Sequence, residues 1–240
     1  MGQPDGSRHP NVGALLRQDP NTGQKRILCT GTLVSSTVFL TAGHCTDFLT
    51  SIGVDPHDVW VTFDPTFDAS SPVIRGTYHT HPAYGYSGQG GFSDPHDIAV
   101  IVLDHAASPT PATLPRLNEL GVRQGNGTLR TQLFTAVGYG TVRDTKKTGP
   151  NAFYFDGVRR FVDQSFNTLL PAWLKLDMNP STGSGGTCYG DSGGPHFVKG
   201  TNHIVSITVT GDTACRATDV TYRLDTASAR AFLRNYVTLP

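Results

Sequence analysis

The hexapeptide GDSGGP at residues 190–195 places Ser192 among glycines, where backbone groups could approach a substrate closely. A serine hydroxyl is a poor nucleophile at its own pKa, so it needs a base to take its proton and a buried carboxylate to orient that base. His44, in TAGHC after an apolar run, and Asp97, at the head of DIAVIVL, supply both residue types. The three residues together predict a Ser-His-Asp site.

Each of these residues also has a simpler interpretation. Gly, Asp, Ser and Pro clusters are typical of loops, a buried histidine is often structural, and an aspartate before a strand often belongs to a turn. GDSGG also fits GxSxG, the nucleophile elbow of α/β-hydrolases. That fold requires an acid and then a histidine after the serine, yet only His196 and His203 follow, and the flanking glycines and proline disfavour a helix. We therefore set the elbow aside.

The elements that would position these residues are mostly strands. Apolar and β-branched runs separated by Gly, Pro and Asn predict strands, at residues 26–42, 58–63, 73–79, 97–103, 133–140, 203–210 and 219–224. Glycine-rich segments at 87–95 and 181–186 are expected to be loops. One helix is expected at about 226–237, capped by Asp225 or Thr226. The pattern predicts an all-β protein with sandwich or barrel architecture.

The proline-rich segment SPTPATLP at residues 108–115 cannot donate to an internal sheet, so it is expected to connect two β units. We expect one unit at residues 10–113 with His44 and Asp97, and a second at 114–240 with Ser192. The 240-residue length suffices for such an arrangement.

Charge and cysteine content limit the partners and the compartment. Lys plus Arg and Asp plus Glu balance at 19 each, so no footprint for nucleic acid or an anionic membrane is present. No membrane span is expected, and no apolar signal core follows Met1, so a soluble mature chain is predicted. The four cysteines lack CxxC pairs and favour disulfides in an oxidising compartment, with buried thiols as the alternative. Local closure favours Cys29 with Cys45 and Cys188 with Cys215.

The order of His44, Asp97 and Ser192, with TAGHC, DIAV and GDSGGP around them, resembles the trypsin-like (chymotrypsin-fold) serine peptidases. CTGTLVSSTVFLTAGHC at 29–45, HPAY at 81–84 and VGYG at 137–140 extend the likeness over roughly residues 10–240. The resemblance implies two six-stranded antiparallel β-barrels packed side by side, with a C-terminal helix. It also implies a secreted serine endopeptidase without cofactor or metal, which acts on polypeptides and is bound by protein inhibitors.

The same resemblance assigns roles to individual residues. Ser192 would attack the peptide carbonyl, His44 would serve as base and then acid, and Asp97 would fix the imidazole tautomer. The N-H groups of Gly190 and Ser192 would form the oxyanion hole. Gly186, Thr187, Ser206 and Thr208 would contribute to substrate binding, with Gly186 at the base of the pocket, Thr208 near its entrance, and Ser206 also hydrogen-bonded to Asp97. The disulfide Cys188–Cys215 would clamp the pocket walls.

Two features depart from the family pattern. Members usually begin, after activation, with Ile-Val-Gly-Gly, whose amino group pairs with the aspartate before the nucleophile, which is Asp191 here. No such start appears, so either another cation pairs with Asp191 or the chain is an unconventional or inactive form, for example a binding protein on this scaffold. Asp219 could point into the specificity pocket and favour basic residues, or it could lie in an exposed loop.

Two weaker motifs remain. His79 and His81 in YHTHPAY could share one face of a strand as metal ligands, but no Cys or acidic pair completes a site, so none is expected. Asn126 in NGT fits a glycosylation sequon, and GNG also signals a tight turn, which we favour.

Overall fold

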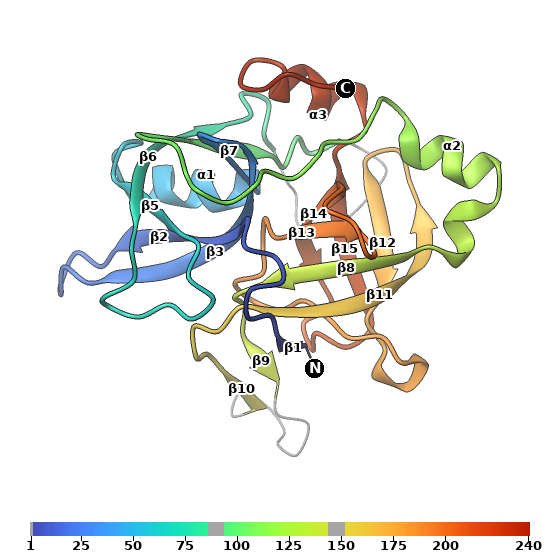
Figure 1. The fold of residues 1–240 in the computed structure, drawn as a ribbon, viewed down its shortest axis with the longest axis horizontal. Coiled ribbons are helices and arrows are strands. Elements are labelled where there is room, and N and C mark those ends of the chain that lie inside the picture. The colour runs from blue at the N-terminus through green and yellow to red at the C-terminus, as the bar shows by residue number, and fades with distance from the viewer. Residues whose placement is uncertain (1, 86–93, 144–151) are drawn as a thin grey trace.

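Two β-barrels lie side by side in the computed structural model, which describes residues 2–85, 94–143 and 152–240 (Figure 1). Residues 87–93 of the expected loop at 87–95 lie outside the described part. The two six-stranded antiparallel barrels and the all-β class predicted above are confirmed. Among the described helices, none combines the length and apolarity needed to cross a membrane.

The first barrel is a closed ring of six antiparallel strands in the order β2-β3-β4-β7-β6-β5. Their bounds are β2 Val12–Gln18, β3 Lys25–Ser35, β4 Val38–Thr41, β5 Val59–Thr62, β6 Ile74–Thr80 and β7 Ala99–Leu103. The apolar run at 26–42 therefore holds two strands joined by a tight turn. Helix α1, Gly43–Ser51, follows β4 directly. The core of this barrel contains fully buried side chains such as Leu15, Leu33, Phe39 and Ile101.

The second barrel runs β8-β11-β12-β15-β14-β13 and closes because β8 pairs with both β11 and β13. Its strands are β8 Leu133–Gly138, β11 Arg160–Leu169, β12 Trp173–Asp177, β13 Pro195–Val198, β14 Ile204–Gly211 and β15 Thr218–Arg223. The hairpin of β9 (Val142–Arg143) and β10 (Phe153–Tyr154) projects from it, and short turns η1 (Thr128–Thr131) and η3 (Pro180–Thr182) complete it.

Both ends of the described chain cross to the other barrel. Strand β1, Gln3–Pro4, pairs with β11, and the buried Arg159 guanidinium holds Asp5 at 2.8 Å while donating to the Val12 and Phe63 carbonyls of the first barrel. Such a guanidinium, with its donors paired, can be buried at acceptable cost. The expected division at residue 113 stays a prediction.

The C-terminal helix α3 spans Ala227–Leu233, so the expected end at 237 is wrong: the chain leaves the helix after Leu233 in a series of turns. Thr226 is its N-cap, because the side chain accepts a hydrogen bond from the Ala229 amide. Phe232 lies 5.1 Å from the His81 ring of the first barrel, between ring centroids.

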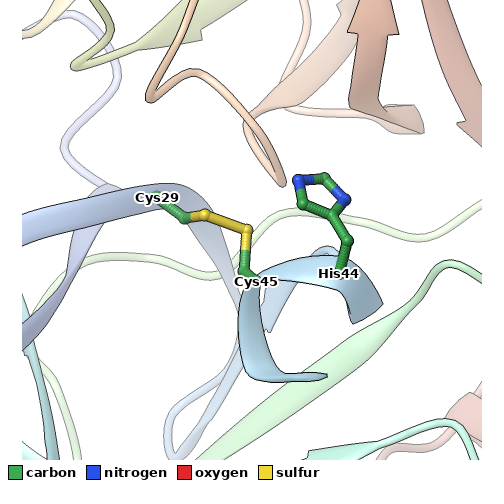
Figure 2. Close-up of side chains that lie close together, drawn as sticks. All are labelled: Cys29, His44 and Cys45. Atoms are coloured by element: carbon green, nitrogen blue, oxygen red, sulfur yellow. A yellow bond between two sulfur atoms is a disulfide. The ribbon is translucent and has the colours of Figure 1, made fainter. Parts of the chain in front are cut away.

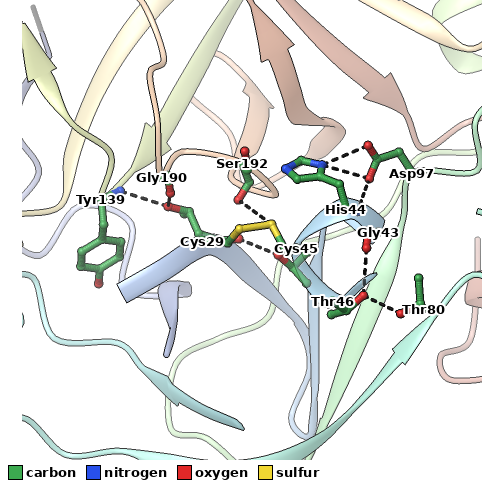
Figure 3. The surroundings of a disulfide bond; sticks show 12 residues. Cys29, Gly43, His44, Cys45, Thr46, Thr80, Asp97, Tyr139, Gly190 and Ser192 are labelled. Carbon is green, nitrogen blue, oxygen red and sulfur yellow. Dashed lines mark hydrogen bonds and ion pairs between the residues drawn. A yellow bond between two sulfur atoms is a disulfide. The ribbon is translucent and has the colours of Figure 1, made fainter. Parts of the chain in front are cut away.

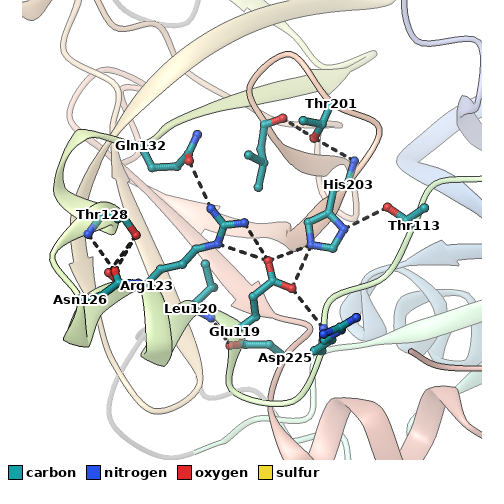
Figure 4. A network of polar contacts seen from close by, with 12 residues as sticks. Thr113, Glu119, Leu120, Arg123, Asn126, Thr128, Gln132, Thr201, His203 and Asp225 are labelled. Atoms are coloured by element: carbon teal, nitrogen blue, oxygen red, sulfur yellow. Dashed lines mark hydrogen bonds and ion pairs between the residues drawn. The ribbon is translucent and has the colours of Figure 1, made fainter.

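The connector between the barrels is anchored by polar contacts at its end (Figure 4). Thr113 lies 3.0 Å from His203 Nδ1, and His203 Nε2 lies 3.0 Å from Glu119 at the start of α2 (Glu119–Gly125). Arg123 pairs with the same carboxylate at 3.0 Å. This network fixes the start of the second barrel against the β13–β14 turn.

Candidate active site

His44 is placed at the first turn of α1, immediately after strand β4. Its predecessor Gly43 has no room for a side chain, since a Cβ there would lie 2.9 Å from the Ile98 amide nitrogen and 3.2 Å from Asp97 Oδ1. This close approach brings the helix against the segment before β7. The His44 side chain keeps 27% of its surface exposed, so it can reach a bound molecule.

Asp97 is wholly buried and orients the imidazole (Figure 3). Its Oδ2 lies 3.0 Å from His44 Nδ1, and its Oδ1 accepts the His44 backbone N-H at 2.9 Å. A carboxylate at a helix N-terminus is stabilised by the unpaired amides there. The contact at Nδ1 leaves Nε2 as the imidazole atom available for proton exchange.

Ser192 lies on the other side of the His44 ring from Asp97 (Figure 3). Ser192 belongs to the second barrel and lies in the turn before β13. Within the part of the chain that the structure describes, no hydrogen bond joins the Ser192 hydroxyl to the imidazole. Catalytic hydrogen bonds are often long before substrate is bound. The structure therefore brings the three predicted residues together across the two barrels.

The backbone of the turn around Ser192 is fixed through its carbonyl groups. Thr141 N-H donates to the Tyr189 carbonyl, and Thr30 donates its hydroxyl to Gly190 O at 2.9 Å and its N-H to Ser192 O at 2.9 Å. Over the described residues, the N-H groups of Gly190 and Ser192 have no hydrogen-bond acceptor. Two unpaired donors beside a serine hydroxyl are what a developing oxyanion needs.

Asp191 anchors this turn from below. Its carboxylate accepts the Gly140 and Cys188 backbone N-H groups, each at 2.8 Å. A Cβ at Gly138 or Gly140 would lie 2.0 or 2.3 Å from its oxygens, so the VGYG glycines make room for it. Burial raises the pKa of Asp191 to about 6, against the lowering effect of the two N-H donors. No side-chain cation forms an ion pair with it among the described residues.

Two disulfides join the segments around the site, Cys29–Cys45 and Cys188–Cys215, the pairing favoured by the sequence. The first bridges β3 and α1 next to His44. The second links the segment before the Ser192 turn to the loop between β14 and β15. Both bridges restrict the unfolded chain and hold site-bearing loops.

A cavity of about 230 Å³ opens beside Ser192. Thr187 and Thr208 line it as predicted, and Tyr189 and Asp212 were not predicted from the sequence. The full lining is Thr187, Cys188, Tyr189, Ser192, Thr208, Val209, Thr210, Gly211, Asp212, Thr213 and Cys215. The only sequence feature that could have indicated Tyr189 as a lining residue is its position directly before Gly190.

The expectation that Gly186 forms the base of this cavity is wrong. Gly186 lines a neighbouring cavity of about 140 Å³ that contains Asp191. A Cβ at Gly186 would lie 2.6 Å from Met178 Sδ, so a residue from just beyond β12 fills the space behind Thr187.

The expected role of Ser206 is also wrong. Its hydroxyl is buried and has no hydrogen-bond partner in the described chain, and it lies on β14 opposite His196 and Arg223. Register shifts in β13 and β14 change which side chains face the cleft, because one extra residue reverses the alternation.

Neither expectation for Asp219 holds. The side chain is fully buried inside the second barrel, with its Oδ2 at 3.0 Å from His196 Nε2 and at 2.9 Å from Gln164 Nε2. It does not line the cavity beside Ser192.

His79 and His81, which share a motif but were not expected to bind metal, have separate partners. The His79 ring packs on Tyr236, and the His81 ring stacks on His96 with centroids 4.5 Å apart. The single ligand-like cluster found among the described residues is Cys29, His44 and Cys45 (Figure 2). Its two sulfurs are bonded to each other, so they are not free thiolates, and this group does not suit a metal ion.

Comparisons with known proteins agree with this arrangement. The chain is 28% identical over 194 residues to kallikrein-8 of Rattus norvegicus, which covers 80% of this chain and 69% of that protein. It is 27% identical over 217 residues to a trypsin of Saccharopolyspora erythraea, covering 87% and 84%. The solved structure of HL collagenase superposes with a TM-score of 0.68 at 16% identity, over 98% of this chain and 96% of that one, which shows a shared fold.

The family model described as Trypsin matches residues 4–230. This match includes both barrels, both disulfides and the segments that carry His44, Asp97 and Ser192. The chain belongs to the trypsin family.

Proposed function

We propose that the protein is a secreted serine endopeptidase that hydrolyses polypeptides through an acyl-enzyme on Ser192. The observation that supports this most is the conjunction at the cleft: an imidazole held by buried Asp97 lies beside Ser192, and the Gly190 and Ser192 amides have no acceptor among the described residues. Trypsin-family membership supports the same reaction class.

In the proposed reaction, Ser192 Oγ attacks the scissile carbonyl while His44 Nε2 takes its proton. The oxygen of the tetrahedral intermediate accepts hydrogen bonds from Gly190 and Ser192, each worth roughly 3 kcal/mol in the transition state. His44 then gives the proton to the leaving amine, and an ester remains on Ser192. Water, deprotonated by His44, releases the acid and restores the serine hydroxyl.

We assign the residue before the scissile bond to the cavity beside Ser192. Threonines are the most frequent residues in the walls, and Asp212 is the one carboxylate in the described lining. That carboxylate already accepts the N-H groups of Arg216, Ala217 and Thr218, so it is committed to its own loop. We therefore propose an uncharged side chain at this substrate position. Protein inhibitors would occupy the same cavity.

Secretion is proposed from the two disulfides, which persist in oxidising compartments. The kallikrein-8 and trypsin similarities are consistent with this location.

The test is digestion of an unstructured protein substrate, with mass spectrometry of the fragments. Wild type is expected to release peptides cut after uncharged residues, and folded Ser192→Ala is expected to release none. Intact substrate with folded wild type would contradict the proposal and favour a binding protein on this scaffold. Cleavage mainly after Lys or Arg would contradict only the assignment of the cavity.

A further inference from the structure

Thr30, on β3 of the first barrel, is a wholly buried residue that contacts the Ser192 turn of the second barrel. Its hydroxyl donates to the Gly190 carbonyl at 2.9 Å and accepts the Tyr139 backbone N-H at 3.1 Å (Figure 3). Its own N-H donates to the Ser192 carbonyl at 2.9 Å, and its carbonyl accepts the Thr41 hydroxyl at 2.8 Å. All polar groups of Thr30 are therefore hydrogen-bonded, which offsets the cost of burying them.

The hydroxyl of Thr30 fixes a peptide group that lies between the two proposed oxyanion donors. The Gly190 carbonyl belongs to the peptide that separates the peptide carrying the Gly190 N-H from the one carrying the Ser192 N-H. Among the described residues, the Thr30 hydroxyl is the one hydrogen-bond donor to this carbonyl. Gly190 has a φ of 99°, a region open to glycine, so its backbone can turn easily unless a partner holds it.

The second barrel leaves room for Thr30 at positions where it has glycine. A Cβ at Gly138 would lie 3.2 Å from the Thr30 hydroxyl oxygen, and one at Gly194 would lie 3.2 Å from its methyl carbon. A Cβ at Gly193 would lie 2.5 Å from the Thr30 carbonyl oxygen. Because a β-branched side chain has few rotamers, this close packing keeps the hydroxyl directed at Gly190.

The backbone of Thr30 also connects the proposed nucleophile with the proposed base. Thr30 holds the Ser192 carbonyl and directly follows Cys29, whose disulfide to Cys45 fixes the residue next to His44. A side-chain substitution at Thr30 leaves this backbone connection in place. Such a substitution therefore tests the hydroxyl alone.

We propose that the Thr30 hydroxyl, by fixing the Gly190 carbonyl, positions the Gly190 and Ser192 N-H groups for the oxygen of the tetrahedral intermediate. Thr30 is then a positioning residue of the first barrel for a part of the site that the second barrel carries. Its effect on turnover rests on the proposed peptidase function. Without the hydroxyl, the Gly190 carbonyl and the Tyr139 N-H each lose a partner, and the Gly190 peptide is free to turn away.

Steady-state hydrolysis of a cleaved peptide tests this role in turnover. Thr30→Val replaces the hydroxyl by a methyl group of similar size. We expect kcat to fall about 10- to 100-fold while KM stays within about twofold, because donors to the oxyanion act in the transition state and not on bound substrate. Thr30→Ser restores a hydroxyl and should recover most of the loss.

Thr32→Val is the matched control. Thr32 is equally buried on the same strand, and its hydroxyl has no hydrogen-bond partner in the described chain. Removing that hydroxyl takes the same atom from the same barrel without breaking a bond to the Ser192 turn, so kcat should stay at the wild-type value. An unchanged kcat in folded Thr30→Val would overturn the proposal, as would an equal loss of kcat in Thr32→Val.

Nuclear magnetic resonance tests the same hydrogen bond without turnover, in a Ser192→Ala background. The Thr30 hydroxyl proton should exchange slowly with water. Thr30→Val should shift the Gly190 carbonyl ¹³C signal and broaden the amide signals of residues 190 and 192, and Thr32→Val should do neither.

A Thr30 hydroxyl that exchanges freely with water would overturn the proposal, even if Thr30→Val did not fold. Unchanged Gly190 signals in folded Thr30→Val would also overturn it. A wild-type protein without peptidase activity would refute the proposed function, and these signals would still decide whether Thr30 positions the two N-H groups.

Discussion

Two of the histidine–aspartate pairs in the described chain share a 3.0 Å separation and have opposite surroundings. His44–Asp97 has a buried carboxylate and an imidazole that is 27% exposed, beside Ser192 where the two barrels meet. His196–Asp219 is sealed on both sides within one barrel. The same chemical groups at the same distance therefore differ in whether solvent and a substrate can reach the imidazole.

Access explains the difference. An imidazole whose second nitrogen faces a cleft can take and return a proton, while a sealed imidazole keeps the charge state that its partner favours. Removing the open histidine should affect turnover more than stability, and removing the sealed one should affect stability more.

His44→Ala is expected to lower kcat/KM on the order of 10⁵- to 10⁶-fold, because the serine loses its base. The measurement is steady-state hydrolysis of a cleaved peptide. His57→Gln is the matched control, since His57 is a half-exposed histidine whose side-chain partners are Asp104 and Thr77 rather than Asp97 or Ser192, and it should keep wild-type activity. Retention of a tenth of the activity in His44→Ala would refute a base at this position.

Asp97→Asn is expected to lower kcat by about 10⁴-fold, since an amide at Nδ1 no longer favours the required tautomer. The substitution keeps the side-chain shape, so circular dichroism should show an intact fold. A loss smaller than tenfold would mean that Asp97 does not orient the imidazole during turnover.

His196→Ala is expected to lower the free energy of unfolding by about 3–5 kcal/mol, because buried Asp219 is left with only the neutral Gln164 amide as a partner. Urea denaturation followed by tryptophan fluorescence measures it. His44→Ala should cost less stability, because Asp97 keeps the backbone N-H of residue 44 as a partner and water can reach the partly exposed site. Equal losses in the two variants would erase the contrast between the pairs.

Asp191 should give the stability curve a recognisable pH dependence. Its pKa is raised to about 6 in the folded state from 3.8, so its contribution to stability is fully present below about pH 4 and is lost as pH rises through 6. This loss amounts to about 3 kcal/mol. Asp191→Asn removes the titrating group, so its stability relative to wild type should rise between pH 4 and 7. Parallel curves for the two proteins would contradict a raised pKa.

The sequence predicted the features that short local patterns determine. Apolar alternation gave many of the strands, the segments TAGHC and GDSGGP indicated the cleft residues, and local closure favoured the disulfides that the structure contains. The 10-residue strand β11, RFVDQSFNTL, was missed because its alternation includes several polar residues at half-buried positions.

The errors arose where distant segments decide what a residue faces. Ser206 was assigned from the family resemblance, and the register shifts in β13 and β14, which decide what each strand residue faces, cannot be read from that likeness. The side chain of Met178 fills the space beside Gly186. Asp219 pairs with His196, which is 23 residues away in the sequence. The role of Gly138 and Gly140 as a cradle for Asp191 likewise depends on tertiary contact.

The most direct measurement is labelling of the oxidised protein with a fluorophosphonate probe, followed by mass spectrometry to locate the adduct. An assembled site predicts an adduct on Ser192 that requires His44 and is absent in Ser192→Ala and His44→Ala. Folded wild-type protein that failed to label, or a label that persisted in His44→Ala, would contradict an activated serine at the cleft between the two barrels.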